Sequence, residues 1–328
     1  MFDPAGPSIH GYAGRLRELA DQGVWIGTSS WKYPGWTGDL YDEQRYLTRG
    51  RFSTPRFEKH CLEEYAAVFR TVCVDAGFYR FPAPEWIDGL CAQVSEGFRF
   101  SFKVTDEITA KRFPALGRHG AKAGQTNPHF LDADLFAEAF LGPMRPHRSR
   151  IGLLIFEFTR FQPGDFERGR DFLDALDGFF PRLPQGWDYG VELRNANFLR
   201  DEYFSLLERH RIGHVYNHWQ RMPAAGAQWT AHPPDLGVVP AGARFLLKPG
   251  RAYQEAVDAF APYDRVQDPQ PEARAAAARM VTEALAQAAE RQARPFYAYV
   301  NNRLEGNALA TIRAVLDEID AAGAPGAG

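Results

Sequence analysis

The stretch "IGLLIFEF", residues 151–158, decides the fold, because it stays apolar from Ile151 to Phe156 and reaches its only charge, Glu157, near its end. A half-buried strand alternates apolar and polar residues, whereas this run places apolar side chains on both faces. Strands of this kind occur in parallel sheets that helices cover on both sides. The stretch therefore predicts an α/β protein with a buried parallel sheet.

Seven other short apolar, β-branched or aromatic runs are spread along the chain, at 24–29, 71–76, 98–104, 188–194, 212–218, 243–248 and 296–302. Helical periodicity lies between most of them, at 55–69, 84–95, 132–141, 165–179, 201–210, 271–293 and 305–320. Eight strands alternating with helices predict a single (β/α)8 TIM-type barrel. A doubly wound open sheet is the main alternative, although no GxGxxG follows the first strand.

The predicted barrel domain covers residues 24–320, with an N-terminal extension at 1–23 and a disordered tail at 321–328. The Pro- and Gly-rich stretch 219–242 has no clear helical pattern, so it predicts one irregular crossover. Residues 105–131 also lack periodicity and predict a long loop over one face.

Composition narrows the classes of function. The chain has 328 residues, 45% of them hydrophobic, and a net charge of −3, so it is typical of globular proteins without an overall basic footprint. Its three cysteines form no metal-binding spacing and favour a reducing compartment. Neither a signal peptide nor an apolar run of membrane-spanning length is present, so we expect a cytoplasmic protein with no membrane association.

The active site of a TIM-type barrel lies at the C-terminal ends of its strands, so the polar residues there are the candidates. Charged residues at the end of nearly every apolar strand predict a polar, enclosed pocket. The candidate catalytic residues are Asp75, Lys103, Glu157 and Glu192. The candidate ligand-binding residues are Ser29, Trp31, Tyr33, Tyr79, Arg194, Asn217, Lys248, Arg251, Asn301 and Asn302.

Glu157 and Glu192 end neighbouring predicted strands, so their carboxylates are expected to approach each other. Such a pair can divide into an acid and a base, or an acid and a nucleophile. Alternatively, each carboxylate is neutralised by a nearby cation, for which Arg160, Arg194 and Lys103 are available.

A phosphate-binding site is a second possibility, between the loops that follow the last two strands. Lys248, Arg251 and the Gly306–Asn307 turn suit an anion there, whereas Glu305 argues against one. An ordinary helix entry is the alternative interpretation of this turn.

Metal ligands are not clustered in the sequence. The nine histidines are scattered, and only His214 and His218 share a strand segment. No cofactor and no dedicated zinc site are predicted, while a divalent metal held by carboxylates alone stays open. The sequence does not indicate the oligomeric state.

The stretch "IGTSSWKYPGWTGDLY" (26–41) resembles the opening signature of the YecE-like family, catalogued as domain of unknown function family 72. Further matches follow in the family's order, at 71–85, 98–109, 152–158, 191–199 and 297–312. The resemblance covers residues 24–320 and implies a (β/α)8-type barrel. It implies no reaction and no substrate.

The sequence departs from the family pattern at several strand ends. Cys73 stands where the family usually has Glu, Asp75 where it has Asn, and Glu157 where it has Gln. After the fifth strand, Asn195 and Phe198 replace the usual His and Trp. A role that depends on the missing Glu or His would have to move to Asp75 and Glu157.

Three functions remain open. The first is an enzyme, a hydrolase or lyase, that acts on a small polar, phosphorylated or sugar-like ligand by acid/base chemistry, with Trp31 and Tyr33 as stacking residues. The second is a nucleic-acid-binding or phosphodiester-processing barrel. Its support is a set of basic residues in or beside the 105–131 loop, Lys103, Lys111, Arg112, Arg118, His119, Lys122 and His129. The third is a non-catalytic ligand-binding protein.

Overall fold

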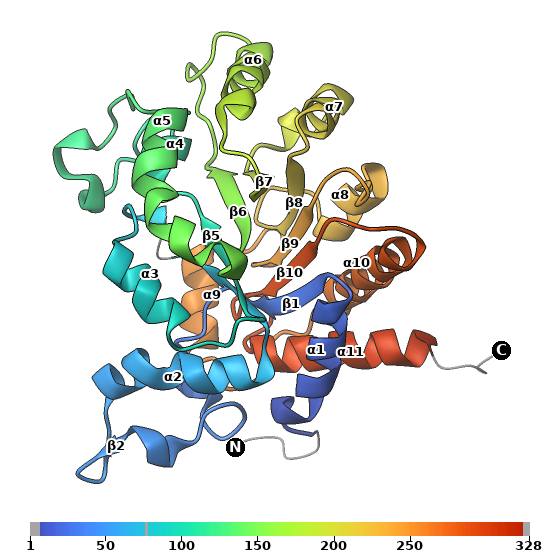
Figure 1. Ribbon diagram of the computed structural model, residues 1–328. Coiled ribbons are helices and arrows are strands. Elements are labelled where there is room, and N and C mark those ends of the chain that lie inside the picture. Colours follow the sequence, from blue (N-terminus) through green and yellow to red (C-terminus); the bar gives the residue numbers. More distant parts are fainter. Residues whose placement is uncertain (1–6, 76–77, 324–328) are drawn as a thin grey trace.

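Eight parallel strands close into a barrel in the computed structural model, which describes residues 7–75 and 78–323 (Figure 1). The strands are β1 (Val24–Thr28), β4 (Thr71–Val74), β5 (Arg99–Lys103), β6 (Ile151–Phe158), β7 (Asp188–Leu193), β8 (Gly213–His218), β9 (Ala241–Phe245) and β10 (Phe296–Val300). Each pairs with its neighbours in chain order, and β1 pairs with both β10 and β4 to complete the ring. The predicted barrel is therefore confirmed. The end of the predicted strand 71–76 lies outside the described residues.

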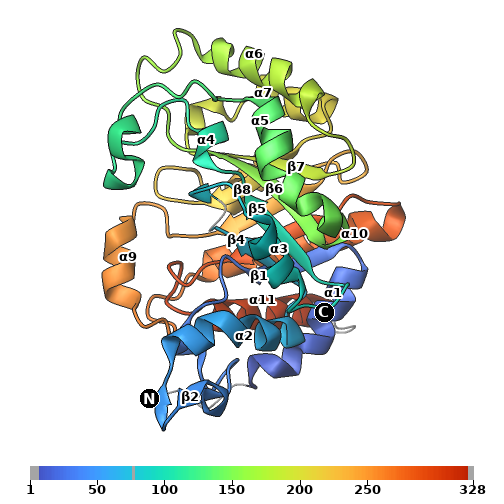
Figure 2. The same ribbon diagram turned by 60° about the vertical axis from the view of Figure 1, so that its left-hand side comes forward.

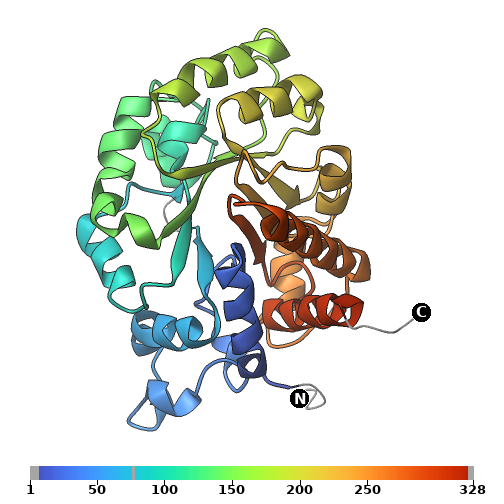
Figure 3. The ribbon, with the colours of Figure 1, turned by 45° about the vertical axis from the view of Figure 1, so that its right-hand side comes forward.

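Helices surround this barrel as an outer ring (Figures 1 and 3). The longer ones are α1 (Ala13–Asp21), α2 (Thr54–Val68), α3 (Pro84–Cys91), α6 (Gly169–Phe179), α7 (Asp201–Arg209), α9 (Tyr253–Phe260), α10 (Pro271–Glu290) and α11 (Ala308–Gly323). Shorter ones are α4 (Asp106–Thr109), α5 (Ala133–Leu135) and α8 (Ala225–Ala231). A small antiparallel ribbon of β2 (Leu47–Thr48) and β3 (Arg51–Phe52) lies outside the barrel.

Four helices lie where the sequence pattern indicated none: α1 in the predicted extension, α4 in the predicted loop 105–131, and α8 and α9. The short helix α8 falls inside the stretch 219–242, where its Gln228 and Trp229 are buried. Helix α9 is set apart from α10 and α11 (Figure 2). Both are too short to give a sustained periodic signal, since α8 has seven residues and α9 has eight.

The structure describes most of the predicted N-terminal extension but only part of the predicted C-terminal tail. In the predicted N-terminal extension, α1 buries Leu16 and Leu19 in the core. The predicted tail 321–328 begins within α11, and residues 324–328 lie outside the described part of the chain. Of the helices described, none is both long and apolar enough to cross a membrane.

Burial on both faces explains the continuous apolar runs. All eight residues of β6 are buried, some facing the helices and others facing the barrel interior. The interior cluster contains Leu153, Ile155 and Tyr299. A hydrogen-bonded layer crosses this interior, because the Tyr299 hydroxyl donates to Ser101 at 2.6 Å and lies 2.8 Å from the Thr71 hydroxyl.

His214 is held neutral by its partners inside the protein. The Gln228 amide nitrogen donates to two backbone carbonyls, so its Oε1 faces His214 Nε2 at 3.4 Å and accepts from it. Nδ1 of His214 then accepts from the Tyr203 hydroxyl at 2.9 Å. Burial lowers the pKa of His214 from 6.5 to about 4.

Acidification should therefore destabilise the protein through His214. Its stabilising contribution is complete above pH 6.5 and declines as pH falls toward 4, because the unfolded chain binds the proton more readily. Between pH 7 and pH 5 the free energy of unfolding should fall by roughly 2 kcal/mol from this residue. Urea denaturation at both pH values should show a smaller fall for His214→Gln than for the unsubstituted protein.

The partly exposed His60 provides the control for this experiment. His60→Gln should keep the full pH-dependent fall, because it leaves His214 and its buried partners unchanged. An unchanged fall in His214→Gln would contradict the assignment.

Candidate functional site

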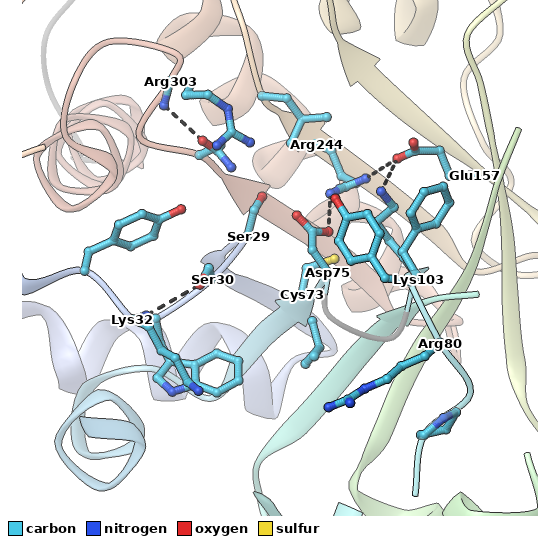
Figure 4. A pocket seen from close by; sticks show the side chains of 18 of the residues that line it. Ser29, Ser30, Lys32, Cys73, Asp75, Arg80, Lys103, Glu157, Arg244 and Arg303 are labelled. Carbon is cyan, nitrogen blue, oxygen red and sulfur yellow. Dashed lines mark hydrogen bonds and ion pairs between the residues drawn. The ribbon is translucent and has the colours of Figure 1, made fainter. Parts of the chain in front are cut away.

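A cavity of about 700 Å³ opens at the C-terminal ends of the barrel strands (Figure 4). Cavities of roughly 300–1,000 Å³ are typical of small-molecule sites. Among the predicted site residues, those that line it are Ser29, Trp31, Tyr33, Asp75, Tyr79, Lys103, Glu157, Arg194 and Asn301. The structure thus brings together side chains from the ends of six strands or the loops that follow them.

Two predicted ligand-binding asparagines do not line the cavity and hold the backbone instead. Asn217 is buried, and its amide donates to the Leu193 carbonyl at 2.9 Å. Asn302 accepts from the Trp36 indole at 3.2 Å and from the first amide of α11, that of Ala308, at 2.7 Å. These contacts fasten β7 to β8, and the first loop to the start of α11.

Lys248 and Arg251 also lie outside the cavity lining. Strand β9 ends at Phe245, earlier than the predicted 248, so both residues fall in the following loop. There Lys248 pairs with Asp268 at 3.4 Å, and Arg251 pairs with the same carboxylate. These cations are therefore already neutralised where the sequence pattern placed a phosphate.

The residues of the Gly306–Asn307 turn in that predicted site, and Glu305 beside it, form hydrogen bonds within the protein. Glu305 beside it is fully buried and accepts hydrogen bonds from Arg274 and Thr311. Asn307 caps α11 by accepting from the Ala310 amide at 2.8 Å. This arrangement matches the ordinary helix entry that the sequence left as the alternative.

Arg244 is the central residue of the site, and the sequence search missed it. It lies inside β9, and its side chain is only 2% exposed. One guanidinium nitrogen contacts Glu157 at 3.0 Å and Glu192 at 2.7 Å, while another contacts Asp75 at 2.9 Å. An arginine within an apolar strand was the available signal, since a buried charge requires partners.

Arg244 is one of six charged residues that form what we call the charge network, Asp75, Lys103, Glu157, Glu192, Arg194 and Arg244. Its members come from β5, β6, β7 and β9, and from the residues that directly follow β4 and β7. Three cations face three carboxylates, so the network is neutral overall.

Glu157 on β6 and Glu192 on β7 are register partners. They therefore lie on neighbouring strands, as the sequence predicted. Three cations converge on one oxygen of Glu157: Lys103 at 3.0 Å, Arg194 at 2.9 Å and Arg244 at 3.0 Å. Burial raises the pKa of Glu157, but these charges outweigh it and hold the pKa well below its usual range. Glu157 is therefore an anion at neutral pH and is unsuited to donate a proton.

Glu192 lies beneath the cavity and does not line it. Its side chain has no exposure, and its two oxygens lie 2.6 Å from Arg194 and 2.7 Å from Arg244. Arg160, the third cation that the sequence offered for neutralising these glutamates, forms no ion pair with either of them. The contacts give Glu192 the position of an anchor for the two arginines.

Asp75 is the most accessible carboxylate of the charge network. Its side chain is 33% exposed, against 8% for Glu157, and Arg244 is its partner in the network. Nearby, the Lys103 ammonium lies 3.9 Å from the centre of the Phe78 ring. Asp75 and Lys103 thus present a base and a cation to the same cavity.

Cys73 lines the cavity. It stands at the position where the family that the sequence resembles usually has Glu. Burial raises the pKa of its thiol to about 12, although Arg244 acts in the opposite direction. A thiol with this pKa stays protonated at neutral pH, so Cys73 is not an activated nucleophile.

Three more cations, Lys32, Arg80 and Arg303, line the cavity, and we call them the rim cations (Figure 4). None of them has a carboxylate of the described residues within 4.0 Å. The Arg303 guanidinium lies 4.6 Å from the ring centre of Tyr253. None of the three was among the candidate residues predicted from the sequence.

The first loop builds one wall of the cavity from aromatic rings. Tyr33 packs against Trp36 and Tyr263, with ring centres 4.9 and 5.5 Å apart. The loop sits so close to the segment after α9 that a Cβ on Gly35 would lie 2.1 Å from a backbone oxygen there. Trp31 is only 6% exposed, which limits the surface that it offers for stacking.

The basic residues in the 105–131 loop mostly have acidic partners. Lys122 pairs with Glu107 at 2.7 Å, and Arg118 lies 3.6 Å from Asp106. Arg112, His119 and His129 likewise lie within 4.0 Å of a carboxylate. The free positive charge that the nucleic-acid hypothesis requires is therefore largely neutralised in this loop.

Within the described residues, no group of three or more His, Cys, Asp or Glu side chains is arranged to hold a metal ion. The carboxylates of the charge network face arginine and lysine nitrogens instead.

Removing the charge of Glu192 should destabilise the fold, because Arg194 and Arg244 would lose a fully buried counter-charge. Breaking a buried ion pair from one side typically costs about 3–5 kcal/mol. We expect Glu192→Gln to lower the free energy of unfolding by roughly 3 kcal/mol in urea denaturation at pH 7. Glu58→Gln, on the exposed face of α2, is the matched control and should change it little. Equal stabilities of the two variants would show that the network does not support the fold.

Comparison with known proteins gives matches of sequence and of fold. The curated relative YecE of Escherichia coli strain K12, described as a UPF0759 protein, is 30% identical over 175 residues. That alignment covers 53% of this chain and 50% of the relative, so the chain spans about half the length of the curated relatives it matches.

Two crystal structures share the fold. A DUF72 family protein from Enterococcus faecalis has a TM-score of 0.59 at 18% identity, over 90% of this chain and 95% of the other. One from Thermotoga maritima has a TM-score of 0.56 at 18% identity, over 91% and 98%. A sequence profile described as "Protein of unknown function DUF72" matches residues 25–326. The chain therefore belongs to the DUF72 family.

Proposed function

We propose that this protein is an enzyme that binds a small, polar, anionic ligand, such as a phosphorylated sugar-like compound, and acts on it by acid/base chemistry. The observation that carries the proposal is the set of rim cations, which line the cavity without carboxylate partners among the described residues. Unpaired cations in a concave site attract and hold anions.

The floor of the cavity supports the same proposal in a different way. The charge network is neutral overall, and its buried ion pairs fix the directions of its side chains. Charges that are already oriented need no rearrangement when charge develops on a ligand. The floor thus suits the reacting part of the ligand, while the rim suits its anionic group.

Within this floor, Asp75 is the group best suited to accept a proton, because it is the most exposed of the three carboxylates. Lys103 and Arg244 lie on the same side of the cavity and can stabilise negative charge that appears on the ligand (Figure 4). The reaction class is proton abstraction by Asp75, with charge stabilisation by these two cations.

Anion binding should depend on Arg303. Isothermal titration with inorganic phosphate and with a panel of sugar phosphates should reveal binding that Arg303→Ala weakens about tenfold or more. Arg265→Ala is the matched control, since Arg265 is exposed in the loop before α10 and does not line the cavity. Failure of every anion to bind, or equal binding by the two variants, would refute the anionic ligand.

Turnover should depend on Asp75. Mass spectrometry of a metabolite mixture incubated with the protein should identify an anionic compound that is consumed. Asp75→Asn keeps an oxygen to accept from Arg244 but cannot take a proton, so the rate should fall by roughly 10²–10⁴-fold while the ligand still binds.

Asp21→Asn, at the exposed end of α1, is the control for charge and should leave the rate unchanged. An undiminished rate in Asp75→Asn would remove Asp75 from the mechanism. A ligand that is retained but never converted would support the non-catalytic alternative.

A further inference from the structure

A second cavity, of about 410 Å³, adjoins the first at the C-terminal face of the barrel. The two cavities share Glu157, Arg194 and Trp219 in their linings. The second adds Arg160 from the loop after β6 and Arg221 from the loop after β8. It is therefore an extension of the same mouth over β6, β7 and β8.

Arg194 and Trp219 form the boundary between the two cavities. The Arg194 guanidinium lies 4.3 Å from the centre of the Trp219 ring. One of its nitrogens pairs with Glu157 and Glu192, while the other, Nη1, has no hydrogen-bond partner in the part of the chain that the structure describes. The boundary thus consists of a flat ring beside a buried guanidinium whose hydrogen-bonding capacity is unfilled.

The second cavity carries its own excess of positive charge. Arg160 and Arg221 are exposed, and no carboxylate of the described residues lies within 4.0 Å of either. Its one acidic lining residue, Glu157, is already surrounded by three cations. An anion is the ligand group that this charge balance favours.

The order of the strands separates the two sets of free cations around the mouth. Arg80 follows β4, two places from β6, and Arg221 follows β8, two places from β10. Arg303 follows β10 and Arg160 follows β6, and these strands are four places apart in the ring of eight. A ligand that contacts Arg303 and Arg160 together therefore carries its anionic groups on opposite sides of the mouth.

We propose that the ligand has two anionic groups, joined by a polar body that crosses the Arg194–Trp219 boundary. One group is held by the rim cations, and the other by Arg160 and Arg221. This inference rests on the proposed function, because it assumes that the first cavity binds an anion. The chemical class is a small bis-anionic compound with separated charges, such as a sugar bisphosphate.

The test uses flexible probes that do not depend on the shape of the natural ligand. Straight-chain α,ω-alkane bisphosphonates of increasing length are compared with the matching alkyl monophosphonates by isothermal titration. At one or more lengths, the bisphosphonate should bind at least tenfold more tightly than its monophosphonate, well beyond the roughly twofold gain from having two ends. Inorganic pyrophosphate, whose charges are adjacent, should show no such gain in affinity over inorganic phosphate.

The variant R160A/R221A should reduce this gain to about twofold while the protein still binds the monophosphonates. Its control is R17A/R56A, which removes two exposed arginines from α1 and α2 and should keep the gain. The two-ended ligand would be overturned if R160A/R221A kept the gain, or if the unsubstituted protein showed no gain at any chain length.

Failure of this inference can be distinguished from failure of the proposed function. Suppose that monophosphonates bind, that Arg303→Ala weakens their binding, and that no bisphosphonate binds more tightly than its monophosphonate. The first cavity then binds an anion with a single charged end, and only the inference fails. If no probe binds, the proposed function fails as well. A single-stranded oligonucleotide that competes more strongly than every bisphosphonate would replace the small ligand with a nucleic acid and overturn the inference.

Discussion

A guanidinium buried in a protein interior has to be surrounded by acceptors, and the site depends on how Arg244 meets that requirement. From β9 it reaches carboxylates that belong to β6, to β7 and to the end of β4. Once these strands close into a ring, their ion pairs fix the floor of the cavity. The same contacts orient the carboxylates and help to hold the pKa of Glu157 well below its usual range, so the charge that stabilises the closed barrel also shapes its chemistry.

Much of the fold could be predicted, because a strand buried on both faces leaves a continuous apolar run such as residues 151–158. The rule that active sites lie at strand ends likewise located Asp75, Lys103 and Arg194 at the cavity. That rule could not find Arg244, which lies within its strand, and it misplaced Lys248 because β9 ends earlier than its apolar pattern. Which cations remain unpaired depends on contacts between distant residues, and these are not visible in the sequence.

The site separates two kinds of positive charge. Cations of the floor are buried and paired, so they are held in place and offer little net attraction. Cations of the rim and of the second cavity have no acidic partners among the described residues. In the function that we propose, they supply the attraction for an incoming anion. Affinity and orientation thus come from different residues, which makes them separable by mutation.

The hydrogen-bonded layer around Tyr299 closes the barrel interior below this floor. The cavity is consequently closed toward the barrel interior and open at the mouth, where the second cavity adjoins it. In the function that we propose, a ligand that fills the mouth would separate a proton accepted by Asp75 from bulk water. Such a proton would be retained until the bound molecule leaves, so the same hydrogen could be returned to another atom of that molecule instead of being exchanged with bulk water.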